Sequence, residues 1–336
     1  MVRKNPKRKC DVNDAKSILE KEGYGIVGEH SAVKICLWTK HALRGDSECW
    51  KEKFYGISSA GCCQMTPSLF HCENKCLHCW RNLDYTSDKK IENADDPIKI
   101  LDGIVEARKK LLAGFKGRKG IDLKKFEDAL EPKLYTMSLS GEPTLYPRLG
   151  EMFKEIRRRG AVSFLVTNGL NPEVLAGFSK EELPTQITIS TNAPNEKLFK
   201  IWHRPTKKDA WKKFNESLYV LKKLKGKVRR VVRLTLVKKG DGEFGNVTNM
   251  TEENIKEHCD LIKKAEPDFI HVKGFMSVGY SRIRMGYDKQ PWFDDVKKYA
   301  LKIKDGLDGY DIAGEDERSC VVMLARDGVG LKIERV

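Results

Sequence analysis

The pattern of apolar and polar positions changes near residue 64. From there on, short runs rich in β-branched and aromatic residues alternate with longer stretches whose apolar residues recur at helical spacing. The predicted strands are Gln64–Phe70, Leu134–Ser140, Val162–Thr167, Gln186–Thr191, Val228–Val237 and Phe269–Met276. The predicted helices cover residues 97–113, 147–159, 172–179, 207–225 and 251–265.

This alternation predicts an α/β fold with a parallel sheet, because parallel strands need helical crossovers to connect them. Right-handed crossovers that never reverse direction curve the strands into a partial (β/α)6 barrel of the TIM type. A flat, doubly wound sheet is the alternative. Asp96-Pro97 and Asn171-Pro172 are expected helix starts, each with a capping side chain followed by proline.

The two flanks differ from this central part, so three parts are predicted: 1–63, 64–280 and 281–336. Residues 1–63 are basic, rich in cysteine and weakly periodic, which predicts a mostly irregular extension with short helices. Residues 281–336 are expected to pack on the barrel as a C-terminal extension. They contain a helical stretch near 291–306 and strand-like runs at Ser319–Ala325 and Gly330–Glu334.

The charge of the chain indicates what kind of partner it binds. Lysine and arginine number 63 against 48 acidic residues, giving a formal net charge of +15. Such a surplus favours a polyanionic partner, most often nucleic acid, although a charge-rich thermophilic surface is the alternative. No apolar run approaches the roughly 20 residues of a membrane span. The basic start lacks the apolar segment of a secretory signal, so we expect a cytoplasmic protein.

Three cysteines at spacings of four and three follow the first predicted strand: Cys72, Cys76 and Cys79. Their thiolates could bind three irons of a cubane cluster and leave the fourth iron open to a ligand. A zinc knuckle completed by His71 or His78, or simply buried cysteines, are the alternatives.

This CxxxCxxC loop at the end of a first strand resembles the radical-SAM superfamily. The resemblance implies a [4Fe-4S] cluster whose free iron chelates S-adenosylmethionine and whose electron releases a 5′-deoxyadenosyl radical. It places His78 near the adenine and Ser140-Gly141-Glu142-Pro143 at the methionine amino group. Further residues at the ends of predicted strands are expected to bind the cofactor, namely Thr167, Asn168, Ser190 and Asn192.

A second set of cysteines lies upstream, with Cys36, Cys49 and Cys62 spaced thirteen and thirteen. From the residues alone these could be buried apolar side chains. The arrangement resembles the archaeal tRNA 4-demethylwyosine synthases, which also match at Cys79-Trp80-Arg81, residues 138–147 and residues 278–282. That resemblance implies a second [4Fe-4S] cluster, with Cys62 preferred over the adjacent Cys63 as ligand. Cys10, Cys259 and Cys320 are expected to be structural.

The same resemblance implies a reaction. Phenylalanine tRNA carrying N1-methylguanosine beside the anticodon condenses with two carbons of pyruvate, whose carboxyl carbon leaves as in a carbon–carbon lyase. Lys51 would form a Schiff base with pyruvate, and burial or positive neighbours would lower its pKa to make it nucleophilic. A separate flavodoxin or ferredoxin would supply electrons, and a monomer is expected.

Basic residues near the expected barrel mouth are the candidates for tRNA contacts, with the target base flipped out to reach the radical. They are Lys116, Arg118, Lys119, Arg204, Lys207, Lys208, Arg282 and Arg284. Two other functions remain open. A radical-SAM activase of a protein partner would not need Lys51 or the upstream cysteines, and a non-catalytic iron–sulfur RNA-binding protein would not need Gly141-Glu142-Pro143.

Overall fold

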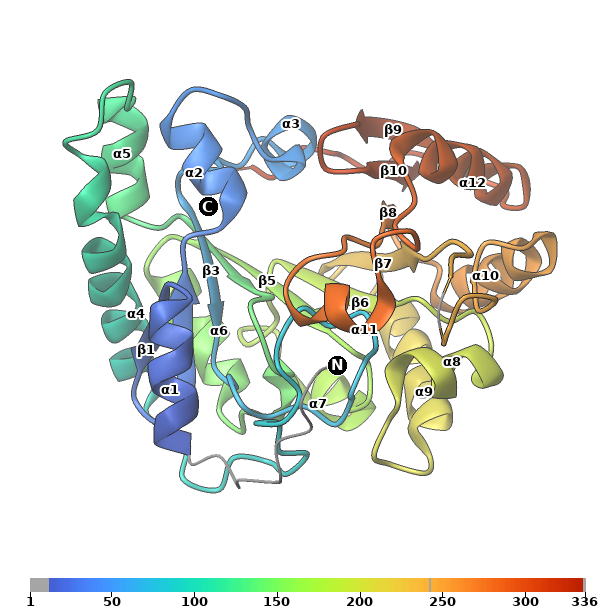
Figure 1. Ribbon diagram of the computed structural model, residues 1–336, viewed down its shortest axis with the longest axis horizontal. Coiled ribbons are helices and arrows are strands. Elements are labelled where there is room, and N and C mark those ends of the chain that lie inside the picture. Colours follow the sequence, from blue (N-terminus) through green and yellow to red (C-terminus); the bar gives the residue numbers. More distant parts are fainter. Residues whose placement is uncertain (1–11, 242, 335–336) are drawn as a thin grey trace.

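A computed structural model describes residues 12–241 and 243–334, which leaves Cys10 outside the described part. One ten-stranded sheet runs through it in the order β1-β2-β3-β4-β5-β6-β7-β8-β10-β9 (Figure 1). The strands are β1 (Tyr24–Val27), β2 (Ser31–Lys34), β3 (Cys62–Thr66), β4 (Leu134–Met137), β5 (Val162–Thr167), β6 (Gln186–Thr191), β7 (Arg229–Leu236), β8 (Phe269–Gly274), β9 (Tyr310–Asp316) and β10 (Val321–Arg326).

The six central strands, β3 to β8, are all parallel, and each pairs with its neighbour in the sequence. A doubly wound sheet would reverse its strand order at a switch point, and none occurs here. The α/β prediction is therefore confirmed, and the uninterrupted order fits a partial barrel. The carboxyl ends of all six strands meet along one rim.

Helices pack along the sheet, most of them on its outer side (Figure 1). They are α1 (Val12–Lys21), α2 (Leu37–Leu43), α3 (Trp50–Tyr55), α4 (Pro97–Leu112), α5 (Leu123–Leu130), α6 (Leu149–Arg158), α7 (Pro172–Gly177), α8 (Glu196–His203), α9 (Ala210–Lys223), α10 (Glu252–Ala265), α11 (Tyr280–Met285) and α12 (Phe293–Asp305). All predicted helices form. The sequence prediction missed α5, α8 and α11, which have six to eight residues each, because so few turns carry little periodic signal.

The N-terminal flank is more regular than predicted. Strands β1 and β2 form an antiparallel hairpin that continues the sheet through β3. At the other end, β10 pairs antiparallel with β8, and the unpredicted β9 pairs with β10. The strand predicted at Gly330–Glu334 is wrong, since those residues form no strand. Arg229 binds the carbonyls of Gly330 and Leu331 instead. The three-part division of the chain stays a prediction.

The two predicted proline-initiated helices begin differently. Asp96 caps α4 by accepting from the backbone of Ile98 and Lys99, as predicted. Asn171 precedes α7 but makes no capping bond. Its side-chain amide donates to Glu73 and Thr144, so a residue predicted to start a helix ties the cysteine loop to the rim.

The main apolar core lies between the strands and the outer helices. A second apolar cluster, which includes Tyr55, Phe164 and Val231, packs within the curve of the sheet. None of the described helices is both long and apolar enough to span a bilayer.

Arg230 and Asp268 form a largely buried ion pair that joins β7 to the residue before β8. The Arg230 side chain is fully buried, and its backbone N–H donates to Asp268 at 2.9 Å. We expect Asp268→Ala to lower the free energy of unfolding by about 3 kcal/mol, because it leaves a buried guanidinium unpaired. Urea unfolding followed by circular dichroism measures this. Glu216→Ala breaks an exposed pair with Lys212 and should leave the midpoint unchanged; equal losses would contradict the assignment.

Candidate active site

The cysteine loop, residues 72–79, follows β3 and is fixed by backbone hydrogen bonds. Cys72 N–H donates to the carbonyl of Ser87 at 2.8 Å, and Leu77 N–H donates to Trp202 at 2.9 Å. Cys72, Cys76 and Cys79 line one cavity of about 220 Å³ at the strand ends, which we call the cysteine-loop pocket. The structure thus brings the three predicted thiols to one place.

Each thiol has a polar neighbour. Arg81 Nε lies 3.2 Å from Cys79 Sγ, His203 Nδ1 lies 3.4 Å from Cys76 Sγ, and Asn168 Nδ2 lies 3.9 Å from Cys72 Sγ. Burial raises the pKa of Cys72 to about 11 and raises the pKa of Cys76 well above its usual value. Positive charge on bound iron would offset this cost, because metal ligation takes the deprotonated thiol.

The alternatives to a cluster can be tested on the same geometry. Within residues 12–241 and 243–334, no group of three cysteine, histidine or acidic side chains converges closely enough to bind a single metal ion. A zinc knuckle requires such convergence. A cubane places three protein sulfurs on three different irons and needs no fourth protein ligand, so Cys72, Cys76 and Cys79 fit a cluster better than zinc.

Glu142 lines the cysteine-loop pocket and is held there by hydrogen bonds. Its carboxylate accepts from Thr144 and from Thr167 Oγ1 at 2.7 Å, and from Asn168 N–H at 2.7 Å. Burial, followed by the nearby Glu73, raises the pKa of Glu142 to about 7. Glu142 and Thr167 are both predicted cofactor contacts, but their side chains bond to each other. The backbone around them is therefore what remains to contact a cofactor.

Several buried polar atoms of the cysteine-loop pocket have no hydrogen-bond partner among the described residues. They are Asn74 Nδ2 and Oδ1, Ser190 Oγ and Arg233 Nε. Buried polar atoms normally have partners, so unsatisfied atoms around a cavity indicate a polar ligand. This fits S-adenosylmethionine, whose amino-acid and ribose groups both donate and accept. His78, by contrast, bonds Asn192 at 3.0 Å, and burial lowers the pKa of His78 to about 4.

A second cavity of about 170 Å³ is lined by Cys36, Cys49, Cys62 and Lys51, and we call it the lysine pocket. Its cysteines come from the segments around α2 and α3 and from the start of β3. Cys63 is fully buried in the main core on the opposite side of the strand. Adjacent strand residues point to opposite faces, so the pairing of Cys62 with this pocket follows from β3 itself.

Lys51 projects into the lysine pocket. Its Nζ lies 3.3 Å from Thr136 Oγ1 and 3.5 Å from Cys62 Sγ. Burial lowers the pKa of Lys51, but the attraction of the three nearby thiols outweighs burial, so its pKa is raised. The expected lowering is wrong for the protein without iron, because sulfurs rather than cations surround the ammonium.

The two pockets adjoin one another. Ser138, Val166 and Arg233 line both of them. The sequence analysis did not identify Arg233 as a site residue, although an arginine directly between the apolar residues Val232 and Leu234 of β7 marks it. Burial lowers the pKa of Arg233 to about 10. Lys273, also missed, lines the lysine pocket and donates to the Ser319 carbonyl.

The structure separates the predicted RNA-binding residues into two groups. Lys207 pairs with the buried Glu73, and Arg284 donates to the carbonyls of Leu77 and Cys79, so both hold the cysteine loop. The others have exposed side chains, namely Lys116, Arg118, Lys119, Arg204, Lys208 and Arg282.

Comparisons with known proteins agree with this geometry. A family model described as the radical SAM superfamily matches residues 67–246, and one described as wyosine base formation matches residues 264–326. An S-adenosyl-L-methionine-dependent tRNA 4-demethylwyosine synthase of Pyrococcus abyssi is 41% identical over 315 residues, covering 93% of this chain and 89% of that protein. The chain belongs to this family.

Other members extend the comparison. The synthase of Pyrococcus horikoshii is 40% identical over 98% of this chain and 92% of its own length. A solved structure described as TYW1 with a lysine-pyruvate adduct bound superposes with a TM-score of 0.81 at 30% identity, covering 97% of this chain and 99% of the other. Membership of the radical-SAM family implies that the chain is an enzyme using S-adenosylmethionine and a [4Fe-4S] cluster.

Gly141 provides a test of the cysteine-loop pocket. Its φ is +72°, and a Cβ there would overlap the carbonyl oxygen of Ser68 and lie 2.9 Å from that of His71. We expect Gly141→Ala to reduce reductive cleavage of S-adenosylmethionine on the order of 100-fold, because the rim backbone must move. Chromatography of released 5′-deoxyadenosine measures this. Gly114→Ala, whose Cβ meets open space, is the control; unchanged cleavage by Gly141→Ala would contradict the close packing.

Proposed function

We propose that this chain converts N1-methylguanosine beside the anticodon of phenylalanine tRNA into tricyclic 4-demethylwyosine, with pyruvate supplying two carbons and losing its carboxyl carbon, as in a carbon–carbon lyase. One observation carries the proposal. The cavity containing Lys51 and three cysteines adjoins the cysteine-loop pocket through Ser138, Val166 and Arg233. A carbon acceptor held at Lys51 therefore lies next to the place where a radical would form.

Two clusters complete this assignment. Cys72, Cys76 and Cys79 would hold the first [4Fe-4S] cluster, and Cys36, Cys49 and Cys62 the second. When bound, the first cluster supplies the electron that cleaves S-adenosylmethionine, and the second presents an open iron to pyruvate. The unsatisfied atoms of Asn74, Ser190 and Arg233 would receive the polar groups of S-adenosylmethionine.

Lys51 would attack the pyruvate carbonyl carbon, form a C=N bond and release water. A sulfur bound to iron no longer holds a full thiolate charge against the ammonium, so burial can then favour the neutral amine. Arg233 and Lys273 place positive charge in the same pocket, where the pyruvate carboxylate would be neutralised. The Lys273 ammonium is held by Ser319, which leaves Lys51 as the nucleophile.

The remaining partners follow from the reaction. The tRNA is a polyanion and suits the surplus of 15 positive charges. A flavodoxin or ferredoxin would deliver electrons, in the cytoplasm and to a monomeric enzyme. A protein-activating radical enzyme would not need a lysine in a second cavity beside the radical site, and a non-catalytic RNA-binding protein would not need the pocket at Gly141. The two-pocket geometry therefore favours the synthase.

The decisive experiment is anaerobic incubation of the reconstituted protein with S-adenosylmethionine, dithionite, pyruvate and N1-methylated phenylalanine tRNA. Nucleoside mass spectrometry should detect the tricyclic product. Lys51→Arg should abolish it by at least about 1,000-fold, because a guanidinium stays protonated and cannot form the C=N bond. Cleavage of S-adenosylmethionine without tRNA should persist in this variant. Wild-type protein that leaves the methylguanosine unchanged would refute the proposed function.

Borohydride reduction in the presence of pyruvate separates the two lysines of the lysine pocket. Peptide mass spectrometry should locate the reduced adduct on Lys51. Lys273→Arg, which changes a lysine of the same cavity, should retain the adduct, whereas Lys51→Arg should lose it. An adduct on Lys273 would overturn the role of Lys51 while leaving the cavity as the pyruvate site.

Neighbouring cysteines offer a matched test of the second cluster. Cys62 lines the lysine pocket and Cys63 packs in the core. Cys63→Ala should bind about eight irons after anaerobic reconstitution, and Cys62→Ala about four. Dithionite-driven release of 5′-deoxyadenosine should survive in both and disappear in Cys76→Ala. About four irons in Cys63→Ala and eight in Cys62→Ala would reverse the ligand assignment. About four irons in wild-type protein would contradict the presence of a second cluster.

A further inference from the structure

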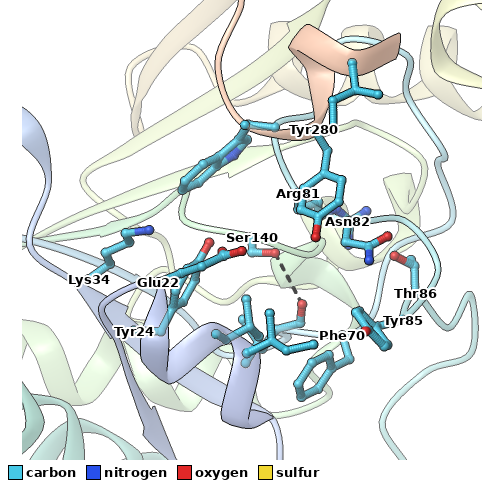
Figure 2. Close-up of a pocket in the computed structure, with 16 residues that line it drawn as sticks. Glu22, Tyr24, Lys34, Phe70, Arg81, Asn82, Tyr85, Thr86, Ser140 and Tyr280 are labelled. Carbon is cyan, nitrogen blue, oxygen red and sulfur yellow. Dashed lines mark hydrogen bonds between the residues drawn. The ribbon is translucent and has the colours of Figure 1, made fainter. Parts of the chain in front are cut away.

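A third cavity, of about 400 Å³, lies outside the rim beside the cysteine loop, and we call it the aromatic pocket. Four separate parts of the chain build it: α1 with the β1–β2 hairpin, the cysteine loop with the segments on either side of it, Ser140 after β4, and α11 with the preceding Gly279. Its walls include five aromatic side chains, namely Tyr24, Phe70, Trp80, Tyr85 and Tyr280. Tyr280 reaches into the cavity from α11, on the side opposite Phe70 and Tyr85 (Figure 2).

One wall carries a cation as well as rings. Tyr24 and Trp80 stack with their ring centroids 6.4 Å apart and their planes inclined by 23°. The ammonium of Lys34 lies 4.3 Å from the Tyr24 centroid and 5.4 Å from that of Trp80. Among the described residues, no carboxylate lies within 4.0 Å of this ammonium. The Lys34 ammonium thus carries its three N–H donors beside two aromatic faces.

The aromatic pocket is mechanically joined to the cysteine loop. Tyr280 N–H donates to the Trp80 carbonyl at 2.9 Å. Gly279, with φ of +56°, allows this approach, because a Cβ would overlap the same carbonyl. Trp80, Arg81 and Ser140 line both the aromatic pocket and the cysteine-loop pocket. A ligand here would be positioned relative to the radical site without entering it.

We propose that the aromatic pocket binds one unstacked nucleobase of the RNA substrate, from a nucleotide flanking the modified guanosine. The inference rests on the proposed function. Single-stranded RNA is recognised by stacking splayed bases on aromatic side chains and by donors to their polar edges, and this cavity presents both. Tyr280 also lies within residues 264–326, the segment matched by the wyosine base formation model and not by the radical SAM model.

The base in the aromatic pocket cannot be the reacting guanine. The reacting base must meet both Lys51 and S-adenosylmethionine, and the residues common to those two pockets are Ser138, Val166 and Arg233. None of these three lines the aromatic pocket. A neighbouring nucleotide held on the far side of the cysteine loop would instead keep the flipped guanosine in register.

Tyr280→Ala tests the pocket, because it removes a ring and keeps the backbone bond to Trp80. We expect binding of a methylated anticodon stem-loop to weaken roughly 5- to 150-fold, the range measured for removal of a base-stacking aromatic side chain. Fluorescence anisotropy at fixed salt measures the dissociation constant. The control is Tyr219→Ala, which removes a half-exposed tyrosine from α9, outside all three pockets. Binding unchanged in Tyr280→Ala, or equally weakened in both variants, would overturn the proposal.

Abasic RNAs identify the bound nucleotide. One stem-loop lacks the base on the 5′ side of the methylguanosine, and another lacks the base on its 3′ side. One of the two should bind wild-type protein at least as weakly as intact RNA binds Tyr280→Ala. The Tyr280→Ala change should weaken the binding of that abasic RNA little further, because the base that Tyr280 contacts is already absent. Fully additive losses for both RNAs would refute base binding here.

Readouts that need no RNA keep this test separate from that of the proposed function. Tyr280→Ala should retain its iron content, its pyruvate adduct on Lys51 and its release of 5′-deoxyadenosine with dithionite. If wild type forms no tricyclic base, the proposed function fails whatever Tyr280→Ala does. Tyr280→Ala could also lose turnover with a flavodoxin donor, keep it with dithionite and bind RNA as wild type does. That result would assign the surface to an electron-transfer partner and overturn the proposal.

Discussion

The active site depends on one buried carboxylate. Glu142 leaves the end of β4 and accepts from Thr167 and Asn168 at the end of β5, so it ties two strand ends together. Glu73, beside Cys72, is fully buried and is held in turn by Asn171 and Lys207. Buried acids persist only when they are paired or hydrogen-bonded, so each partner is needed for the others to stay in place. The cysteine loop is thereby fixed to the rim.

This network explains why several residues with expected ligand roles act on protein atoms instead. Lys207 and Arg284 carry charges that could suit RNA phosphates. In the fold, Lys207 neutralises Glu73 and Arg284 binds the carbonyls of the cysteine loop. A loop that must present three thiols to one cluster has little conformational freedom. Cations from distant segments hold it, Lys207 through the Glu73 carboxylate and Arg284 through the loop carbonyls. The positive charge of this enzyme is therefore partly structural.

The arrangement of cavities follows from strand order. Six parallel strands in sequence place their carboxyl ends along one rim, so loops that are far apart in the chain line adjacent pockets. The β1–β2 hairpin extends the same sheet, which brings Tyr24 and Lys34 beside Trp80. One continuous sheet thus positions the lysine pocket, the cysteine-loop pocket and the aromatic pocket relative to one another.

The sequence by itself determined the alternation of strands and helices and the three-cysteine loop, because these are local patterns of spacing and polarity. The pairing of Lys51 with the upstream cysteines was expected only from the resemblance to the synthase family. Strands β5 and β6 match their predicted bounds. Only the tertiary structure decided that Cys62 and not Cys63 faces Lys51, that Asn171 binds Glu73 and that Arg233 lies between two pockets. Those facts depend on which face of a strand meets which distant segment, and contacts between distant segments leave no periodic trace along the chain.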